Sequence, residues 1–274
     1  MSAARSFVTM DAPGDVLSPS SVASYLSCGP KWRYGHIDKL DDPPTGARTM
    51  GSAVHEALGA NFGQKIDTRT DLPAAGVQAV YLEAWDKLVR GDMPNRFGKP
   101  SLPTEFRDDE LPGELKAQGL ALSLKYLEEA APKIQPTAVE LPVTGTIAGV
   151  RVRGFIDLLD DSGRIIDIKT GAKKPNEISS DYKFQVASYS QICDSASGHA
   201  RVDTLVKTKS PQLVHLDCTI DQKDVDATQK LYPLVQNSIR ADVWLPNRSH
   251  FMCSRRSCGF WRACEREFGG TVGE

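Results

Sequence analysis

The first half of the chain has the hydrophobic periodicity of helices. Four apolar residues at spacings of four predict a helix from Ala47 to Phe62: Met50, Val54, Leu58 and Phe62. Ser18 followed by Pro19 is typical of a helix start, because Ser caps free backbone N–H groups and Pro fits the first turn. We expect this short helix to end near residues 28–30, a loop over residues 38–46, and further helices near residues 77–90 and 112–131.

After residue 136 the pattern changes to the alternation of strands. The expected strands are Thr137–Ile147, Val150–Leu159 and Arg164–Lys169, with a turn at residues 160–163. Then come a helix near 180–196, strands near 201–207 and 212–219, a helix near 221–241 and an irregular tail. Helices followed by a meander and by further helices and strands predict an α/β (α+β) domain, with a central mixed β-sheet flanked by helices.

The stretch Val150–Thr170 carries the residues with the clearest chemistry. Strand alternation places Asp167 and Lys169 on the same face of one strand, and a hairpin brings Asp157 of the preceding strand near them. Two close carboxylates repel unless a cation lies between them, and oxygen ligands of this kind suit Mg²⁺ or Mn²⁺. The lysine could position an attacking water or neutralise charge on a phosphodiester. An ordinary amphipathic hairpin with surface acids is the alternative.

Length and composition allow a globular protein with a sizeable core: 274 residues, 40% of them hydrophobic and 25% charged. The net charge of −2 excludes long-range attraction as the main way of holding nucleic acid, so positive charge would be local or come from metal ions. No apolar run occurs in residues 1–15, and none approaches the roughly 18 residues of a membrane span. We therefore expect a soluble, cytoplasmic protein, whose six cysteines favour metal over disulfides.

Six short motifs, in order along most of the chain, resemble the RecB-like branch of the PD-(D/E)XK nucleases, especially its iron–sulfur members. Those members include small nucleases associated with CRISPR adaptation, phage exonucleases and the AddB nuclease domain. The motifs are LSPSSVASYLSCGPKWRYGHID with Cys28, GSAVHEAL with His55, GFID with Asp157, DIKT with Asp167 and Lys169, QVASY with Gln185 and Tyr189, and CSRRSCGFWRAC with Cys253, Cys258 and Cys264. Four residues separate the first tail pair here, whereas the family often has two.

The resemblance implies a restriction-endonuclease-like nuclease core that binds Mg²⁺ or Mn²⁺. The implied metal ligands are His55, Asp157, Asp167 and the carbonyl of Ile168. Lys169 would assist the attacking water, and Gln185 would hold that lysine or the water. Tyr189 would hydrogen-bond a phosphate or stack on a base. For Gln185 and Tyr189, an ordinary amphipathic helix is the alternative.

Four cysteines, Cys28 and the three of the tail, can hold either Zn²⁺ or a [4Fe–4S] cluster, and residue type does not separate the two. The resemblance implies the cluster, in a mainly structural role that joins the C-terminal tail to the first helix. Cys193 and Cys218 lie in an expected helix and strand, where we expect them to be small buried apolar residues.

For several other polar and aromatic residues near these motifs, two roles are open. Glu140 could join the metal site or pair with a lysine, or it could be a solvated residue at a strand edge. Lys173, Lys174 and Lys183 could form a solvated face or hold a nucleic-acid strand. Three aromatic residues could stack on bases or pack around the cofactor: Trp32, Tyr34 and Trp261.

The sequence favours a metal-dependent DNA exonuclease, directed at single strands or ends, in phage recombination, DNA repair or CRISPR-associated DNA processing. The chain has no G-x-x-x-x-G-K-[ST] loop, so unwinding would need a helicase partner, and a recombination or CRISPR-adaptation partner is equally open. One alternative is a catalytically inactive iron–sulfur module that binds DNA ends, against which the complete set of Asp157, Asp167 and Lys169 argues. The other is a structural protein stapled by zinc.

The expected organisation has four parts. Residues 1–16 form a loose tail, and residues 17–136 a helical subdomain with the first cluster cysteine and the metal-ligand histidine. Residues 137–244 form the nuclease core, and residues 245–274 a cysteine-rich tail that closes the iron–sulfur site.

Overall fold

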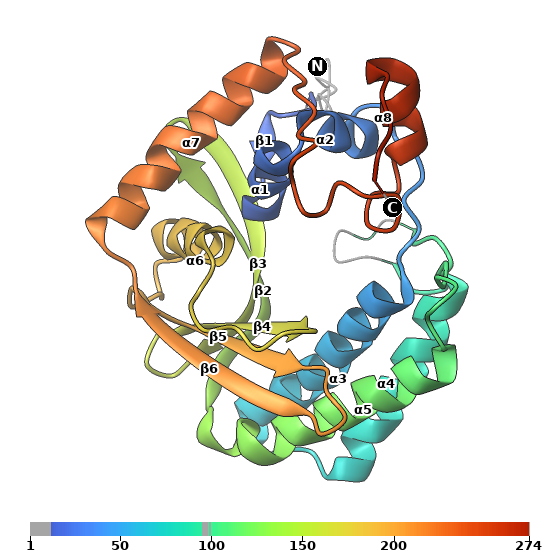
Figure 1. The fold of residues 1–274 in the computed structure, drawn as a ribbon. Helices are drawn as coiled ribbons and strands as arrows, with labels where there is room; N and C mark the ends of the chain where they lie inside the picture. Colours follow the sequence, from blue (N-terminus) through green and yellow to red (C-terminus); the bar gives the residue numbers. More distant parts are fainter. Residues whose placement is uncertain (1–11, 95–97, 99, 274) are drawn as a thin grey trace, which may run out of the picture.

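A mixed β-sheet lies at the centre of the computed structural model, which describes residues 12–94, 98 and 100–273 (Figure 1). Its strands are β1 (Val16–Leu17), β2 (Pro136–Ile147), β3 (Val150–Asp160), β4 (Ile165–Gly171), β5 (His199–Val206) and β6 (Gln212–Thr219). Most of the expected N-terminal tail, residues 1–11, lies outside the described residues.

The sheet combines an antiparallel meander with a parallel step. Strands β2, β3 and β4 pair antiparallel, β5 lies parallel to β4, and β6 returns antiparallel to β5. The short β1 pairs parallel to β3. The parallel pairing of β4 and β5 requires a crossover, which helix α6 (Ser180–Ile192) supplies. The predicted mixed central sheet is therefore confirmed.

The remaining helices are α1 (Pro19–Ser27), α2 (Gly29–His36), α3 (Gly46–Thr68), α4 (Ala74–Arg90), α5 (Pro112–Glu129), α7 (Gln222–Arg240) and α8 (Trp261–Phe268), with a 3₁₀ turn at Ala131–Lys133. Ser18 caps α1 by accepting from the Ser21 N–H, as the sequence predicts. Among the helices that the structure describes, none is both long and apolar enough to cross a membrane.

Helices cover both faces of the sheet, because apolar strand residues alternate between two cores. Leu158 and Ile166 join the core formed with α3, α4 and α5, whereas their neighbours Leu159 and Ile165 join the core formed with α6. Figure 1 shows α6 and α7 on one side of β2 and β3, with α3, α4 and α5 on the other. Full burial of one such aliphatic side chain stabilises the fold by about 1.5–3 kcal/mol. The α+β class is confirmed.

The structure confirms one local prediction and corrects three. The first helix ends at Ser27, close to the expected end, but residues 29–36 form an additional helix, α2, whose first turn contains Pro30. The tail is not irregular throughout, since α8 forms over residues 261–268 with a strongly amphipathic pattern. Helix α3 continues six residues beyond the expected end at Phe62, to Thr68, where Arg69 adopts a left-handed C-cap.

Candidate active site

Helix α3 carries His55, and its N-terminus is fixed by a carboxylate. Glu110 accepts hydrogen bonds from the backbone N–H groups of Gly46 (3.0 Å) and Ala47 (2.9 Å), which the start of a helix leaves without intrahelical partners. Five residues after Gly46, a Cβ atom at Gly51 would lie 3.1 Å from Thr170 Oγ1 of β4. The glycine thus lets α3 approach the strand of the DIKT motif and brings His55 over the sheet.

Glu140 lies in β2 at a break in the ladder with β3. Val139 pairs with Leu158 and Leu141 with Ile156, which leaves Glu140 beside Asp157 with a left-handed backbone, φ +46°. This conformation is uncommon for a residue with a side chain and disfavoured by about 1–2 kcal/mol. The register is the same before and after this residue, so Glu140 stays opposite Asp157 of the adjacent strand.

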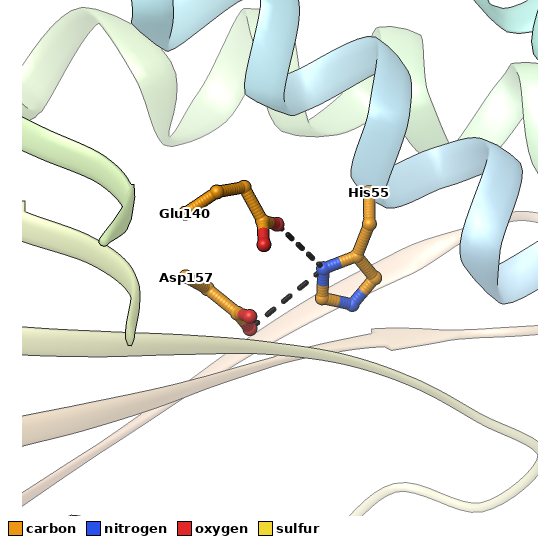
Figure 2. A group of neighbouring side chains, drawn as sticks. All are labelled: His55, Glu140 and Asp157. Carbon is orange, nitrogen blue, oxygen red and sulfur yellow. Dashed lines mark ion pairs between the residues drawn. The ribbon is translucent and has the colours of Figure 1, made fainter. Parts of the chain in front are cut away.

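His55, Glu140 and Asp157 form a candidate metal centre (Figure 2). One ligand atom from each lies within 4.8 Å of the others, and His55 Nδ1 is 3.7 Å from Asp157 Oδ2 and 4.0 Å from Glu140 Oε1. Figure 2 shows the three side chains converging from α3, β2 and β3. Two carboxylates and an imidazole, mostly shielded from water, suit a divalent cation that offsets the repulsion between the acids.

The second acid and the lysine lie next to this group. Lys169 Nζ donates to Asp167 Oδ1 at 2.7 Å, and Gln185 Nε2 of α6 donates to the same oxygen at 2.9 Å. Burial lowers the pKa of Lys169, but the charges of Asp167 and Asp157 outweigh it and raise that pKa above its usual value. The lysine is therefore a cation at neutral pH. Gln185 and Lys169 thus donate to the same carboxylate oxygen.

The hairpin register brings Asp157 and Asp167 to the same end of the β3–β4 ladder. Leu158 pairs with Ile166, and one step further the Asp157 carboxylate accepts a hydrogen bond of 3.0 Å from the Ile168 N–H. Both acids are nearly excluded from solvent, with exposed fractions of 7% and 3%. A buried, hydrogen-bonded carboxylate keeps a fixed orientation, which a ligand position requires.

Tyr189 lies beneath the site rather than at its opening. Its exposed fraction is 7%, and a Cβ atom at Gly154 would lie only 2.4 Å from its ring. The glycine of GFID therefore provides space for the tyrosine of QVASY. Burial and the charges of Asp157 and Asp167 raise the pKa of Tyr189 to about 12, so the hydroxyl remains protonated.

The four predicted cofactor cysteines line one pocket. Cys28 joins α1 to α2, and it meets the three tail cysteines Cys253, Cys258 and Cys264 around a mainly apolar cavity. Burial and the neighbouring thiols Cys28 and Cys253 raise the pKa of Cys258 and Cys264. Two cations act in the opposite direction and favour thiolates, Lys31 at Cys258 and Arg248 at Cys264.

Contacts between the tail and the N-terminal helices hold this pocket closed. Arg33 of α2 forms a bidentate ion pair with Glu267 of α8, and the Tyr34 hydroxyl donates to the same carboxylate at 2.8 Å. Within the tail, Arg255 pairs with Glu265 at 3.3 Å. The two ends of the chain thus form one unit around the cysteines.

Other predicted residues separate into packing and surface positions. Trp32 and Tyr34 are only 1% and 3% exposed, so their rings pack inside the protein and are not accessible for stacking on bases. Trp261 lines the cysteine pocket between two arginine side chains. Lys173 and Lys174 are exposed, and Lys183 lies 3.9 Å from Asp224. Of the two remaining cysteines, Cys193 is buried as expected and Cys218 is half-buried.

The sequence pattern leaves the role of Glu140 open and gives no prominence to Tyr182. Glu140 has a left-handed backbone conformation and its side chain lies near His55. The alternation of apolar and polar residues along a strand does not reveal such a local conformation, so the sequence could not predict this position. Tyr182 lies in the first turn of α6, three residues before Gln185, and its ring faces Lys169. Its spacing from Gln185 on one helix face is the signal that could have found it.

Known proteins resemble this chain in sequence profile and in fold. The sequence profile of the PD-(D/E)XK nuclease superfamily matches residues 16–265. The crystal structure of a candidate exonuclease from Eubacterium rectale is similar, with 11% identity, coverage of 90% of each chain and a TM-score of 0.54. The protein SSO0001 is 12% identical over 92% of this chain and 94% of its own, with a TM-score of 0.36. No curated protein matches the sequence. Because the profile covers nearly the whole chain, the chain belongs to the PD-(D/E)XK nuclease superfamily.

Proposed function

We propose that this chain is a metal-dependent deoxyribonuclease, an exonuclease that hydrolyses phosphodiester bonds at DNA single strands or ends. The observation that carries the proposal is the convergence of His55, Glu140 and Asp157 directly beside the Asp167–Lys169 pair. In a nuclease superfamily, a complete set of ligands and a charged lysine support an active enzyme over an inactive DNA-end-binding module.

The donor set fits Mg²⁺ or Mn²⁺. His55, Glu140 and Asp157 would hold the ion, and Asp167 and the carbonyl of Ile168 would add oxygen ligands. The imidazole favours Mn²⁺, which tolerates nitrogen ligands better than Mg²⁺ does. A bound divalent cation supplies a more acidic water and stabilises the negative charge that develops on the phosphodiester.

The protein residues around the metal position the reacting groups. The Ile168 N–H fixes the Asp157 carboxylate, and the Gln185 amide fixes Asp167. The Lys169 ammonium group is held beside both acids, where it can orient the attacking water or offset charge on a non-bridging phosphate oxygen. Tyr189 supports the strand that carries Asp157 through its packing on Gly154, so we assign it positioning in place of substrate contact.

We propose a [4Fe–4S] cluster at the cysteine pocket. The four cysteines line one mainly apolar pocket, and Lys31 and Arg248 lie near two of them. Four thiolates can hold either Zn²⁺ or a [4Fe–4S] cluster, and the resemblance to the iron–sulfur nucleases supports the cluster.

The proposed organisation follows from the two sites. Residues 17–136 form a helical subdomain that supplies His55, residues 137–244 form the nuclease core, and residues 245–274 close the cluster. The chain would act in phage recombination, DNA repair or CRISPR-associated DNA processing. Partner proteins in one of those pathways, such as a helicase, would deliver the DNA.

The experiment that tests the function uses protein purified without oxygen and end-labelled single-stranded and double-stranded DNA. Cleavage is measured with Mn²⁺, Mg²⁺ or EDTA, beside Asp167→Ala and Lys169→Ala. We expect metal-dependent cleavage by the wild type and its loss in both variants, with DNA binding retained. No cleavage by folded, iron-loaded wild type would overturn the enzyme in favour of the DNA-end-binding module. Zinc without iron in the purified protein would overturn the cluster alone.

A further inference from the structure

The first two turns of α6 direct two side chains at the Asp167–Lys169 pair. Gln185 donates to Asp167, and the ring of Tyr182 lies 5.3 Å, measured to its centroid, from Lys169 Nζ. Residues three apart share a helix face, so one helix contacts both the anion and the cation of the pair. Tyr182 is itself fixed at the helix start, where its N–H donates to the Ser179 side chain.

We propose that Tyr182 is a positioning residue, whose ring face holds the Lys169 ammonium group against Asp167. An ammonium group within about 6 Å of an aromatic centroid is attracted by the ring face, and the attraction grows when water is partly excluded. The Lys169 side chain is 25% exposed, so without the ring its flexible stem can turn the charge toward solvent. The effect of Tyr182 on catalysis rests on the proposed function, whereas its effect on Lys169 does not.

The ring, not the hydroxyl, is the active part of this contact. Its hydroxyl makes no hydrogen bond that the described residues reveal, whereas the ring lies over the lysine. Burial raises the pKa of Tyr182, so the hydroxyl remains neutral at physiological pH and adds no charge. Tyr182→Phe keeps the ring, and Tyr182→Leu keeps apolar volume but removes the aromatic face. The two variants therefore separate the cation–ring contact from simple packing.

The first measurement needs no enzyme activity. Full-length, iron-loaded protein is briefly acetylated, and modification of Lys169 is followed by peptide mass spectrometry with the exposed Lys174 as internal reference. We expect Tyr182→Leu to raise the relative acetylation of Lys169 several-fold, while Tyr182→Phe and the neighbouring surface variant Asp181→Asn match the wild type. Equal labelling of Lys169 in all four proteins would overturn the proposal.

The second measurement is steady-state cleavage of labelled DNA with Mn²⁺. We expect Tyr182→Leu to lower kcat about tenfold at unchanged KM, as for loss of a partly buried cation–ring contact, and Tyr182→Phe to restore it. In a Lys169→Ala background, Tyr182→Leu should add no further loss. A higher KM in Tyr182→Leu alone, with kcat unchanged, would overturn positioning in favour of base stacking.

The two measurements separate the failure of this inference from failure of the proposed function. If the wild type cleaves no DNA but the variants show the expected labelling, the Tyr182–Lys169 contact is supported and the nuclease function is rejected. If the wild type is active but labelling and kcat are the same in all variants, the contact is rejected and the nuclease function is supported. Equal thermal melting of the variants shows that α6 remains folded in each.

Discussion

The carboxylate site and the cysteine pocket both collect residues that are distant in sequence, but they do so by different means. His55, Glu140 and Asp157 come from a long helix, from the edge strand β2 and from its neighbour β3, whose register and packing fix each position. Three of the four cysteines lie on the C-terminal tail, which is held mainly by ion pairs, turns and the short α8. The first site is part of the fold, whereas the second is a junction between the chain's two ends.

This difference predicts how each site depends on its bound group. Sheet residues keep their geometry without a metal, because buried apolar contacts on both faces hold the strands. The cysteine tail has few apolar contacts, so a cofactor bound to its thiols would hold the tail in place. Cofactor binding there would therefore add directly to the free energy of unfolding. Function should therefore be most sensitive at the carboxylates, and folding most sensitive at the cysteines.

The largest effect is expected at a carboxylate. Asp157→Asn should lower cleavage by about 10³-fold or more, because it removes a charged metal ligand, while the amide oxygen can still accept from the Ile168 N–H. Single-turnover cleavage and thermal melting measure the two effects. A large fall in melting temperature together with the loss of activity would contradict the idea that this site is held by the sheet.

Loss of a cysteine should affect stability more than any metal ligand does. With the proposed cluster in this pocket, Cys28→Ser is expected to lose its iron and the brown colour, and to melt about 10 °C lower than the wild type, which corresponds to several kcal/mol for a chain of this size. Calorimetry and iron analysis measure both. Cys218→Ser is the matched control on β6, outside the pocket, and should keep its iron. An iron-loaded Cys28→Ser protein would remove Cys28 from the ligand set.

The sheet that carries the carboxylate site also contains a buried ion network around Asp203, whose loss should destabilise the sheet. Asp203 of β5 has no exposed surface and accepts from the Tyr126 hydroxyl (2.7 Å), Arg201 (2.8 Å) and His215 (2.6 Å). Asp203→Asn should lower the free energy of unfolding by about 3–5 kcal/mol, since it leaves Arg201 buried beside a neutral group. Urea denaturation measures the change. Unaltered stability would show that the network is solvated.

The same network gives a pH dependence. Burial raises the pKa of Asp203, but hydrogen bonds from His215 and the charge of Arg201 outweigh it and lower that pKa below 3.8. A depressed carboxylate pKa stabilises the fold above the unfolded value and loses this contribution as pH falls through the folded value. Wild type should therefore lose stability below about pH 4 more steeply than Asp203→Asn does. An equal loss of stability in the two proteins as the pH falls would contradict this assignment.

The smallest effect is expected from removal of the divalent metal. EDTA should lower the melting temperature by about 4 °C at most. A metal ion present at about ten times its Kd adds only about 1.4 kcal/mol to the free energy of unfolding. Differential scanning calorimetry with and without Mn²⁺ measures it. A shift as large as that of Cys28→Ser would show that the carboxylate site is not preorganised.

Sequence reasoning succeeded where a short periodic pattern carried the information. Alternation in the GFID and DIKT strands placed Asp157, Asp167 and Lys169 on a hairpin, and the β3–β4 register has that form. The meeting of four cysteines in one pocket followed from their residue type and the family resemblance. The mixed sheet followed from the order of helical and alternating segments.

What sequence reasoning missed depends on non-local or aperiodic structure. The two-residue strand β1 is too short to show alternation, and it forms only because β3 offers a free edge. Helix α2 was missed because Gly29-Pro30 suits a helix end as well as a helix start. The lysine contact of Tyr182 exists only once α6 packs beside β4, so no local pattern encodes it.

The left-handed backbone of Glu140 has a consequence for engineering. A residue that adopts this conformation without strain, such as glycine, would remove the disfavoured φ of +46° and one of two repelling carboxylates at the same time. Glu140→Gly should then give a protein that melts higher than wild type and cleaves poorly. Such a trade between durability and turnover would provide a long-lived, slow form of the enzyme, suited to trapping intact DNA for structural work.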